Sequence, residues 1–170
     1  GLNADNVNSY AHYMRENLFD KIDIDIDNTH LPNGAAQDLE AECARYTELL
    51  ESMPQDIQLL GLGSDGHIGF NEPYSPFDGH THVVTLAEST VKDNSRLFSH
   101  IDEVPRKAIT MGIADIMRAR KILILASGAN KAQAVYDMIK GEINEACPAS
   151  VLQRHPDVTV VLDKSAAALL

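Results

Sequence analysis

One loop gathers most of the groups that could carry out acid–base chemistry. Residues 61–73 read Gly-Leu-Gly-Ser-Asp-Gly-His-Ile-Gly-Phe-Asn-Glu-Pro, which places Asp65, His67 and Glu72 close together in the sequence. A carboxylate bonded to one imidazole nitrogen fixes the ring's tautomer and leaves the other nitrogen free to exchange protons with a ligand. Pro73 disfavours helical geometry at Glu72, so that carboxylate can turn back toward the ring. We expect His67 to act as an acid–base group flanked by Asp65 and Glu72.

Glycine is concentrated in the same loop. Four of the ten glycines lie at positions 61, 63, 66 and 69, directly after an apolar run. Glycine lets the backbone take positive φ and approach a ligand closely, and ligands of open α/β sheets bind at the loops that leave the carboxyl ends of strands. An isolated Asp-x-His pattern would be explained as well by a simple turn. The glycines and the strand-end position favour a functional site.

A second loop offers a place for an anion. Residues 127–131, Ser-Gly-Ala-Asn-Lys, follow another apolar run and begin a predicted helix. Unpaired N–H groups at a helix N-terminus, together with the ammonium of Lys131, can hold a phosphate-sized anion. Taken alone, Lys131 is better explained as a surface lysine, and Arg96 as a solvent-exposed helical arginine. Together with the first loop, this one indicates acid–base chemistry on a small phosphorylated molecule.

The elements that would position these loops follow an α/β pattern. Continuous apolar runs predict strands buried on both faces, as in a mainly parallel sheet, at 57–62, 81–86, 108–113, 122–125 and 158–162. Helical spacing predicts helices over 8–20, with Ser9 as N-cap, from 39 to a stop at Pro54, and over 90–99, 114–119, 129–139 and 149–154. The acidic stretch 22–27 is expected to be a loop. Because more than fifty residues precede the first strand, we expect further strands upstream.

Composition narrows the class of protein. The chain has 170 residues, 14 Lys and Arg, 25 Asp and Glu, and a net charge of −11, which predicts a single α/β domain over residues 1–170. An acidic chain without a basic stripe is not expected to bind nucleic acid. No apolar run reaches the roughly 20 residues of a membrane span, and the first residues lack the basic-then-apolar pattern of a signal peptide, so we expect a cytoplasmic protein that does not bind membranes.

No metal site is expected from the sequence. The two cysteines, Cys43 and Cys147, lie far apart and do not form a CxxC pair. Asp78, His80 and His82 could be interpreted as metal ligands, but two histidines two residues apart are more simply bystanders. We assign no metal to the chain.

The residues singled out above resemble a known family. Residues 61–73 are similar to the signature of the glucosamine-6-phosphate deaminases, within the isomerase/deaminase family, and the likeness continues in order through most of the chain, including 94–96, 104–105, 108–112, 128–132 and 149–153. The resemblance implies a Rossmann-like three-layer α/β/α fold. It also implies a hydrolase of amino-sugar catabolism, which converts glucosamine 6-phosphate and water into fructose 6-phosphate and ammonia. No metal or organic cofactor is implied.

The resemblance also assigns roles to individual residues. His67 matches the histidine that opens the sugar ring, and Asp65 and Glu72 match the carboxylates that orient and tune it. Arg96 and Lys131 match the basic residues that hold the substrate phosphate. The family's phosphate loop and its proton-shuttling carboxylate match positions upstream of residue 1. The chain is therefore expected to be the C-terminal two-thirds of a deaminase/isomerase domain, truncated at the N-terminus, and to turn over little by itself.

Two alternatives stay open. A 6-phosphogluconolactonase shares the fold and a similar Gly-x-Asp-Gly-His element, although the continuation over 70–73 favours the deaminase. The chain could instead be an inactive fragment that binds sugar phosphates. Its oligomeric state is not determined by the sequence: a monomer and a homo-oligomer are both compatible, and unpaired strand edges would favour self-association.

Overall fold

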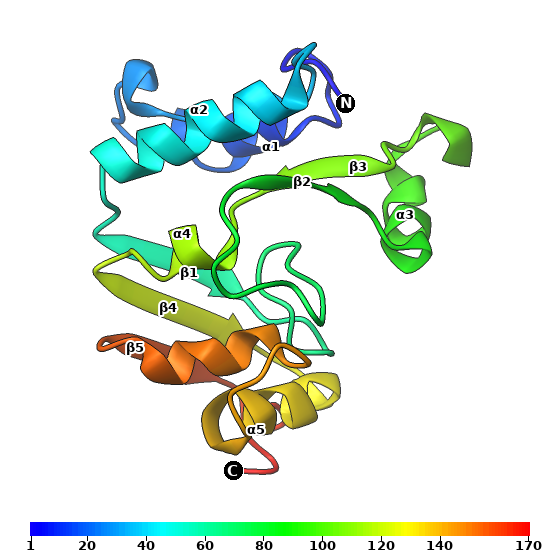
Figure 1. The fold of residues 1–170 in the computed structure, drawn as a ribbon. Coiled ribbons are helices and arrows are strands. Elements are labelled where there is room, and N and C mark those ends of the chain that lie inside the picture. The colour runs from blue at the N-terminus through cyan, green and yellow to red at the C-terminus, as the bar shows by residue number, and fades with distance from the viewer. The chain divides into compact units, whose positions relative to one another are not determined.

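The chain folds into two compact units (Figure 1). The computed structural model describes the backbone of residues 1–170 and every side chain except those of Ser89 and Asp93. The first unit comprises residues 1–46 and 83–109, and the second comprises residues 47–82 and 110–170. The chain therefore passes between the units after residues 46, 82 and 109.

A parallel sheet of three strands forms the centre of the second unit. Its order is β1 (Ile57–Gly61), β4 (Lys121–Ala126) and β5 (Val158–Leu162). The last residue of β1, Gly61, pairs with Leu125, and Leu125 pairs with Val161, so all three strands end at one edge. This confirms the strands expected at 57–62, 122–125 and 158–162. It also confirms that the loops over 61–73 and 127–131 leave the same edge of one parallel sheet.

The sheet is buried on one face only. Ile124 of β4 is fully buried in a cluster with side chains from α4 (Ile113–Ile116), α5 (Ala132–Lys140) and the 3-10 helix η6 (Pro148–Arg154). The register places Leu59, Leu125 and Val161 together on the opposite face, where their exposed fractions are 58%, 46% and 51%. The expectation that these strands are buried on both faces is wrong for the described residues, because no helix of the second unit packs on that side.

The helical segments of the second unit lie where they were predicted, but two of them contain 3-10 helix and the third is a single turn. The helix expected at 129–139 begins as a 3-10 turn, η5 (Ala129–Lys131), because Gly128 has φ +94° and accepts a bond from the Lys131 N–H at 3.1 Å. The segment expected as a helix at 149–154 is the 3-10 helix η6. The segment expected at 114–119 contains only the single turn α4.

The first unit is mainly helical. Ser9 is the N-cap of α1 (Tyr10–Asn17), as predicted, because its Oγ accepts from the His12 N–H at 3.0 Å. The helix expected at 90–99 ends early as α3 (Glu88–Asn94). Its other helical elements are η1 (Phe19–Lys21), η2 (Ile26–Asn28), η3 (Ser95–Leu97), η4 (Ile101–Glu103) and the first part of α2 (Leu39–Ser52), which continues into the second unit. Every helix among the described residues is too short or too polar to cross a bilayer.

Two predicted strands do not join the main sheet. β2 (His82–Thr85) and β3 (Lys107–Thr110) pair with each other in a separate sheet of two strands. The prediction that 81–86 and 108–113 belong to the mainly parallel sheet is therefore corrected. An apolar run indicates a strand but not its partner, and Ile113, expected at the end of such a run, instead begins α4 fully buried.

Ile124 and Leu125 are neighbours in β4 that lie on the buried and the exposed face of the sheet, so variants of the two test whether only one face is buried. Ile124→Ala should lower the free energy of unfolding by about 2–5 kcal/mol, because it leaves a cavity in the core. Leu125→Ala should lower it by less than about 1 kcal/mol, because that side chain is already half in water. Urea unfolding of both variants measures the difference. Equal losses would contradict the open face.

Candidate active site

The loop after β1 depends on glycine at two positions. The Gly63 N–H donates to the His67 carbonyl at 2.9 Å, and the Gly66 N–H donates to the Gly63 carbonyl at 3.2 Å, which closes a tight turn. A Cβ at Gly63 would overlap His67 Nδ1, and one at Gly66, where φ is +85°, would overlap the Cys147 sulfur. These glycines let the loop approach its own imidazole and the Cys147 sulfur, while the approach to a ligand stays a prediction.

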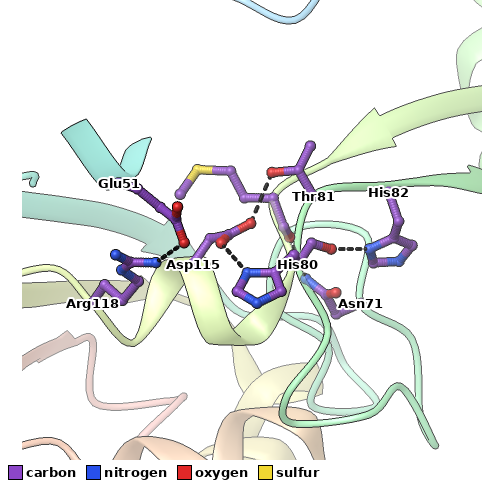
Figure 2. Close-up of polar contacts among 8 residues, drawn as sticks. Glu51, Asn71, His80, Thr81, His82, Asp115 and Arg118 are labelled. Atoms are coloured by element: carbon purple, nitrogen blue, oxygen red, sulfur yellow. Dashed lines mark hydrogen bonds and ion pairs between the residues drawn. The ribbon is translucent and has the colours of Figure 1, made fainter. Parts of the chain in front are cut away.

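The far end of the loop is fixed by a buried amide. Asn71 is almost fully buried, and its Nδ2 donates to the carbonyls of Ile68 and Met111, each at 2.9 Å (Figure 2 shows Asn71). The Phe70 N–H donates to Thr110 Oγ1 at 3.1 Å. Sequence reasoning did not single out Asn71 or Thr110. The loop also contains Ser64, Asp65, His67 and Glu72, so residue type alone did not distinguish the buried Asn71, whose amide needs partners.

The structure brings the three predicted acid–base residues together. His67 Nδ1 lies 2.7 Å from Asp65 Oδ1 and 3.5 Å from Glu72 Oε2. The ring is 33% exposed, yet Nδ1 itself is buried and neither oxygen approaches it with the geometry of a hydrogen bond. Catalytic hydrogen bonds are often poorly aligned before a ligand binds. A small shift of Asp65 would complete the bond and leave Nε2 available for proton exchange.

The two carboxylates differ in acidity although they flank the same ring. Partial burial opposes ionisation of Asp65, but the His67 backbone N–H, which donates at 3.2 Å, and the nearby imidazole together hold the pKa of this carboxyl below its usual value. Partial burial raises the pKa of Glu72 above its usual value, and the neighbouring Asp65 carboxylate adds to the rise despite the opposing effect of His67. Pairs of groups with divergent pKa values are typical of acid–base sites.

The same three side chains are a possible cation site. One ligand atom from each of Asp65, His67 and Glu72 lies within 4.8 Å of the others, and divalent transition metals accept this set of donors. Such clusters also occur without an ion, so the expectation of no metal stays a prediction. His80 and His82 do not form a cluster with Asp78 among the described residues, because His80 Nδ1 lies 2.7 Å from Asp115 Oδ1.

The two basic residues expected at the site lie in different units. Lys131 is half-buried on η5, directly after β4, and so lies at the same sheet edge as the loop after β1. The Gly128 N–H beside it donates to Asp163 Oδ2 at 3.0 Å and is not free for an anion. Hydrogen bonds from the backbone N–H groups of Ala166 and Gly128 lower the pKa of Asp163. Arg96 is exposed on η3 of the first unit.

Comparison with known proteins identifies the family to which the chain belongs. Residues 2–161 match the family model described as glucosamine-6-phosphate isomerases/6-phosphogluconolactonase. A glucosamine-6-phosphate deaminase from Listeria monocytogenes is 56% identical over 170 residues, which cover 100% of this chain and 72% of the relative. A solved monomeric glucosamine-6-phosphate deaminase is 51% identical, with a TM-score of 0.93 over 100% of this chain and 71% of that one.

The chain has a more distant likeness to a protein of another activity. The solved 6-phosphogluconolactonase from Trypanosoma brucei is 25% identical, with a TM-score of 0.72 over 99% of this chain and 70% of that one. The similarity to solved structures confirms the predicted Rossmann-like α/β fold with a mainly parallel sheet.

The two carboxyls should titrate at separate pH values. In a carbon-detected NMR titration, Asp65 should titrate below its ordinary pKa and Glu72 above it. His67→Gln should raise the pKa of Asp65, because the neighbouring imidazolium is lost, while Asp163, which is held by backbone N–H groups, should not change. An unchanged Asp65 would contradict the contact.

The directions of these shifts set opposite effects on folding stability. The stabilisation linked to Asp65 is present above its unfolded pKa and lost as pH falls through its folded pKa. The stabilisation linked to Glu72 is present below its unfolded pKa and lost as pH rises through its folded pKa.

Proposed function

The chain belongs to the glucosamine-6-phosphate isomerase/6-phosphogluconolactonase family, and we propose that it acts in the conversion of glucosamine 6-phosphate and water into fructose 6-phosphate and ammonia. One observation carries the proposal. An imidazole lies between two carboxylates of divergent acidity, at the carboxyl edge of a parallel sheet, in a chain 56% identical to a glucosamine-6-phosphate deaminase. Because water replaces the amine, the reaction is hydrolytic.

His67 is proposed to open the sugar ring. Nε2 would accept the proton of the C1 hydroxyl and return a proton to the ring oxygen, so that the bond between C1 and the ring oxygen breaks and an aldehyde forms. Asp65 beside Nδ1 favours the tautomer in which Nε2 can accept a proton, and Glu72 supports the imidazolium as it forms. The C2 proton is then removed while O1 gains a proton, which gives an enolamine. Protonation of C1 converts it into an iminium at C2, water adds to that carbon with loss of a proton, and the protonated amine leaves as ammonia. No residue of this chain is assigned to the C2 proton transfer.

Lys131 and Arg96 are proposed to bind the substrate phosphate. A phosphate dianion needs compensating charge because the chain as a whole carries −11. Lys131 is the basic side chain that directly follows β4, whose end neighbours the end of β1. Support for Arg96 comes from the family resemblance alone, on its match within residues 94–96.

We propose that residues 1–170 are the C-terminal two-thirds of a single deaminase/isomerase domain. The chain covers 72% of the Listeria relative, and the open apolar face of its sheet is suited to packing against further helices. A phosphorylated sugar carries fixed charge and does not cross a membrane unaided, which favours a cytoplasmic location for the reaction.

Substrate binding and turnover separate the candidate functions. Calorimetry with fructose 6-phosphate should show binding that weakens about tenfold in Lys131→Met, because one charged contact to phosphate is lost. Lys121→Met, at the opposite end of β4, is the matched control and should bind unchanged. His67→Gln should bind within about threefold of the wild type and lose at least about a hundredfold of any ammonia release.

The remaining outcomes decide between the alternatives. We expect slow ammonia release from the 170-residue chain, because none of its residues is assigned to the C2 proton transfer. Hydrolysis of 6-phosphogluconolactone without ammonia release would favour the lactonase, and binding without either reaction would favour a binding module. Absence of binding as well would refute a sugar-phosphate site.

A further inference from the structure

A second histidine–carboxylate pair lies outside the proposed catalytic triad, the name used here for Asp65, His67 and Glu72. Residues 79–81, here called the strap, run past α4 immediately before β2. Asp115 of α4 accepts at Oδ1 from His80 Nδ1 at 2.7 Å and at Oδ2 from Thr81 Oγ1 at 2.8 Å (Figure 2). The strap is thus tied to α4 by both oxygens of one carboxylate.

Burial of the Asp115 carboxyl group costs free energy unless its oxygens have hydrogen-bond partners. Its side chain is fully buried, and its only ionic partner among the described residues is His80, which is half exposed. Both oxygens of this carboxyl group have a partner, His80 Nδ1 on one and Thr81 Oγ1 on the other. A buried polar group is retained where its hydrogen bonds are satisfied, and removal of one partner is correspondingly expensive.

The strap also packs closely against the turn that precedes α4. The Ala114 N–H donates to the Gly79 carbonyl at 3.0 Å. A Cβ at Gly112 would overlap the carbonyl oxygens of both Gly79 and His80, so the two backbones touch there. Any outward movement of the strap would remove the support for the turn at 111–112.

The segment 111–112 also holds in place the loop that carries Asp65, His67 and Glu72. The Met111 carbonyl accepts from Asn71 Nδ2 at 2.9 Å, and Asn71 directly precedes Glu72. Glu72 Oε2 lies 3.5 Å from His67 Nδ1. A continuous series of contacts therefore joins the Asp115 carboxylate to the proposed catalytic imidazole, all within the second unit.

We propose that Asp115 is a positioning residue for Glu72 and His67, which acts by tying the strap against the 111–112 turn that supports Asn71. The expected effect on the rate of the reaction rests on the proposed function. The expected effect on the position of the loop does not. Asp115 touches no part of the triad. Its effect on chemistry is confined to the placement of the loop.

Hydrogen exchange measured by mass spectrometry tests this coupling without substrate. In Asp115→Asn, amides of residues 68–72 should exchange about tenfold faster than in the wild type, while those of α5 keep their rates. Arg118→Gln is the matched control, because it removes an exposed ion pair with Glu51 just after α4 and leaves the strap intact (Figure 2). Its exchange at 68–72 should stay within about twofold of the wild type.

A second variant tests the same coupling with a smaller change, in case Asp115→Asn does not fold. Thr81→Val removes one of the two donors to Asp115 and should accelerate exchange at 68–72 by about threefold. Acceleration confined to the strap, acceleration spread evenly over α5, or none at 68–72 in either variant would overturn the proposal.

Kinetics provide the second readout. Where the wild type releases ammonia, Asp115→Asn should lower kcat by about tenfold to a hundredfold and change KM by less than about threefold, because the loop is misplaced while the phosphate contacts remain. A rise in KM at unchanged kcat would overturn the positioning role. If the wild type releases no ammonia, the proposed function fails while the exchange measurement still decides the role of Asp115.

Discussion

Parallel pairing of β1 with β4 is the constraint on which the candidate site depends. Because the two strands run in the same direction and end in register, the loop with His67 and the turn with Lys131 must emerge side by side. An antiparallel arrangement would send them to opposite edges.

Within the site, local geometry is determined more by backbone and amide groups than by the charged side chains. Gly63 leaves room for the imidazole ring, and Asn71 attaches the loop to the segment after β3. Asp65 and Glu72 can then differ in acidity while both lie beside one ring. A buried amide with two carbonyl partners is a directional restraint, whereas the half-exposed carboxylates could each adopt several rotamers.

The sequence predicted local chemistry better than it predicted pairing. The triad of Asp65, His67 and Glu72 followed from residue type and spacing, because those residues lie within one short loop. The separate pairing of β2 with β3 did not, since an apolar run carries no information about its partner. Asp115 was also missed, because its partners His80 and Thr81 are 35 and 34 residues away. Contacts of that range depend on the fold and not on spacing.

The open face of the parallel sheet has a practical consequence for anyone who handles this polypeptide. Within residues 1–170, the side chains of Leu59, Leu125 and Val161 form an exposed apolar surface. Fluorescent dyes that report on denaturation by binding such surfaces would already bind the folded molecule. A bright signal at low temperature would then reflect the architecture of the sheet and not a fraction of unfolded chains.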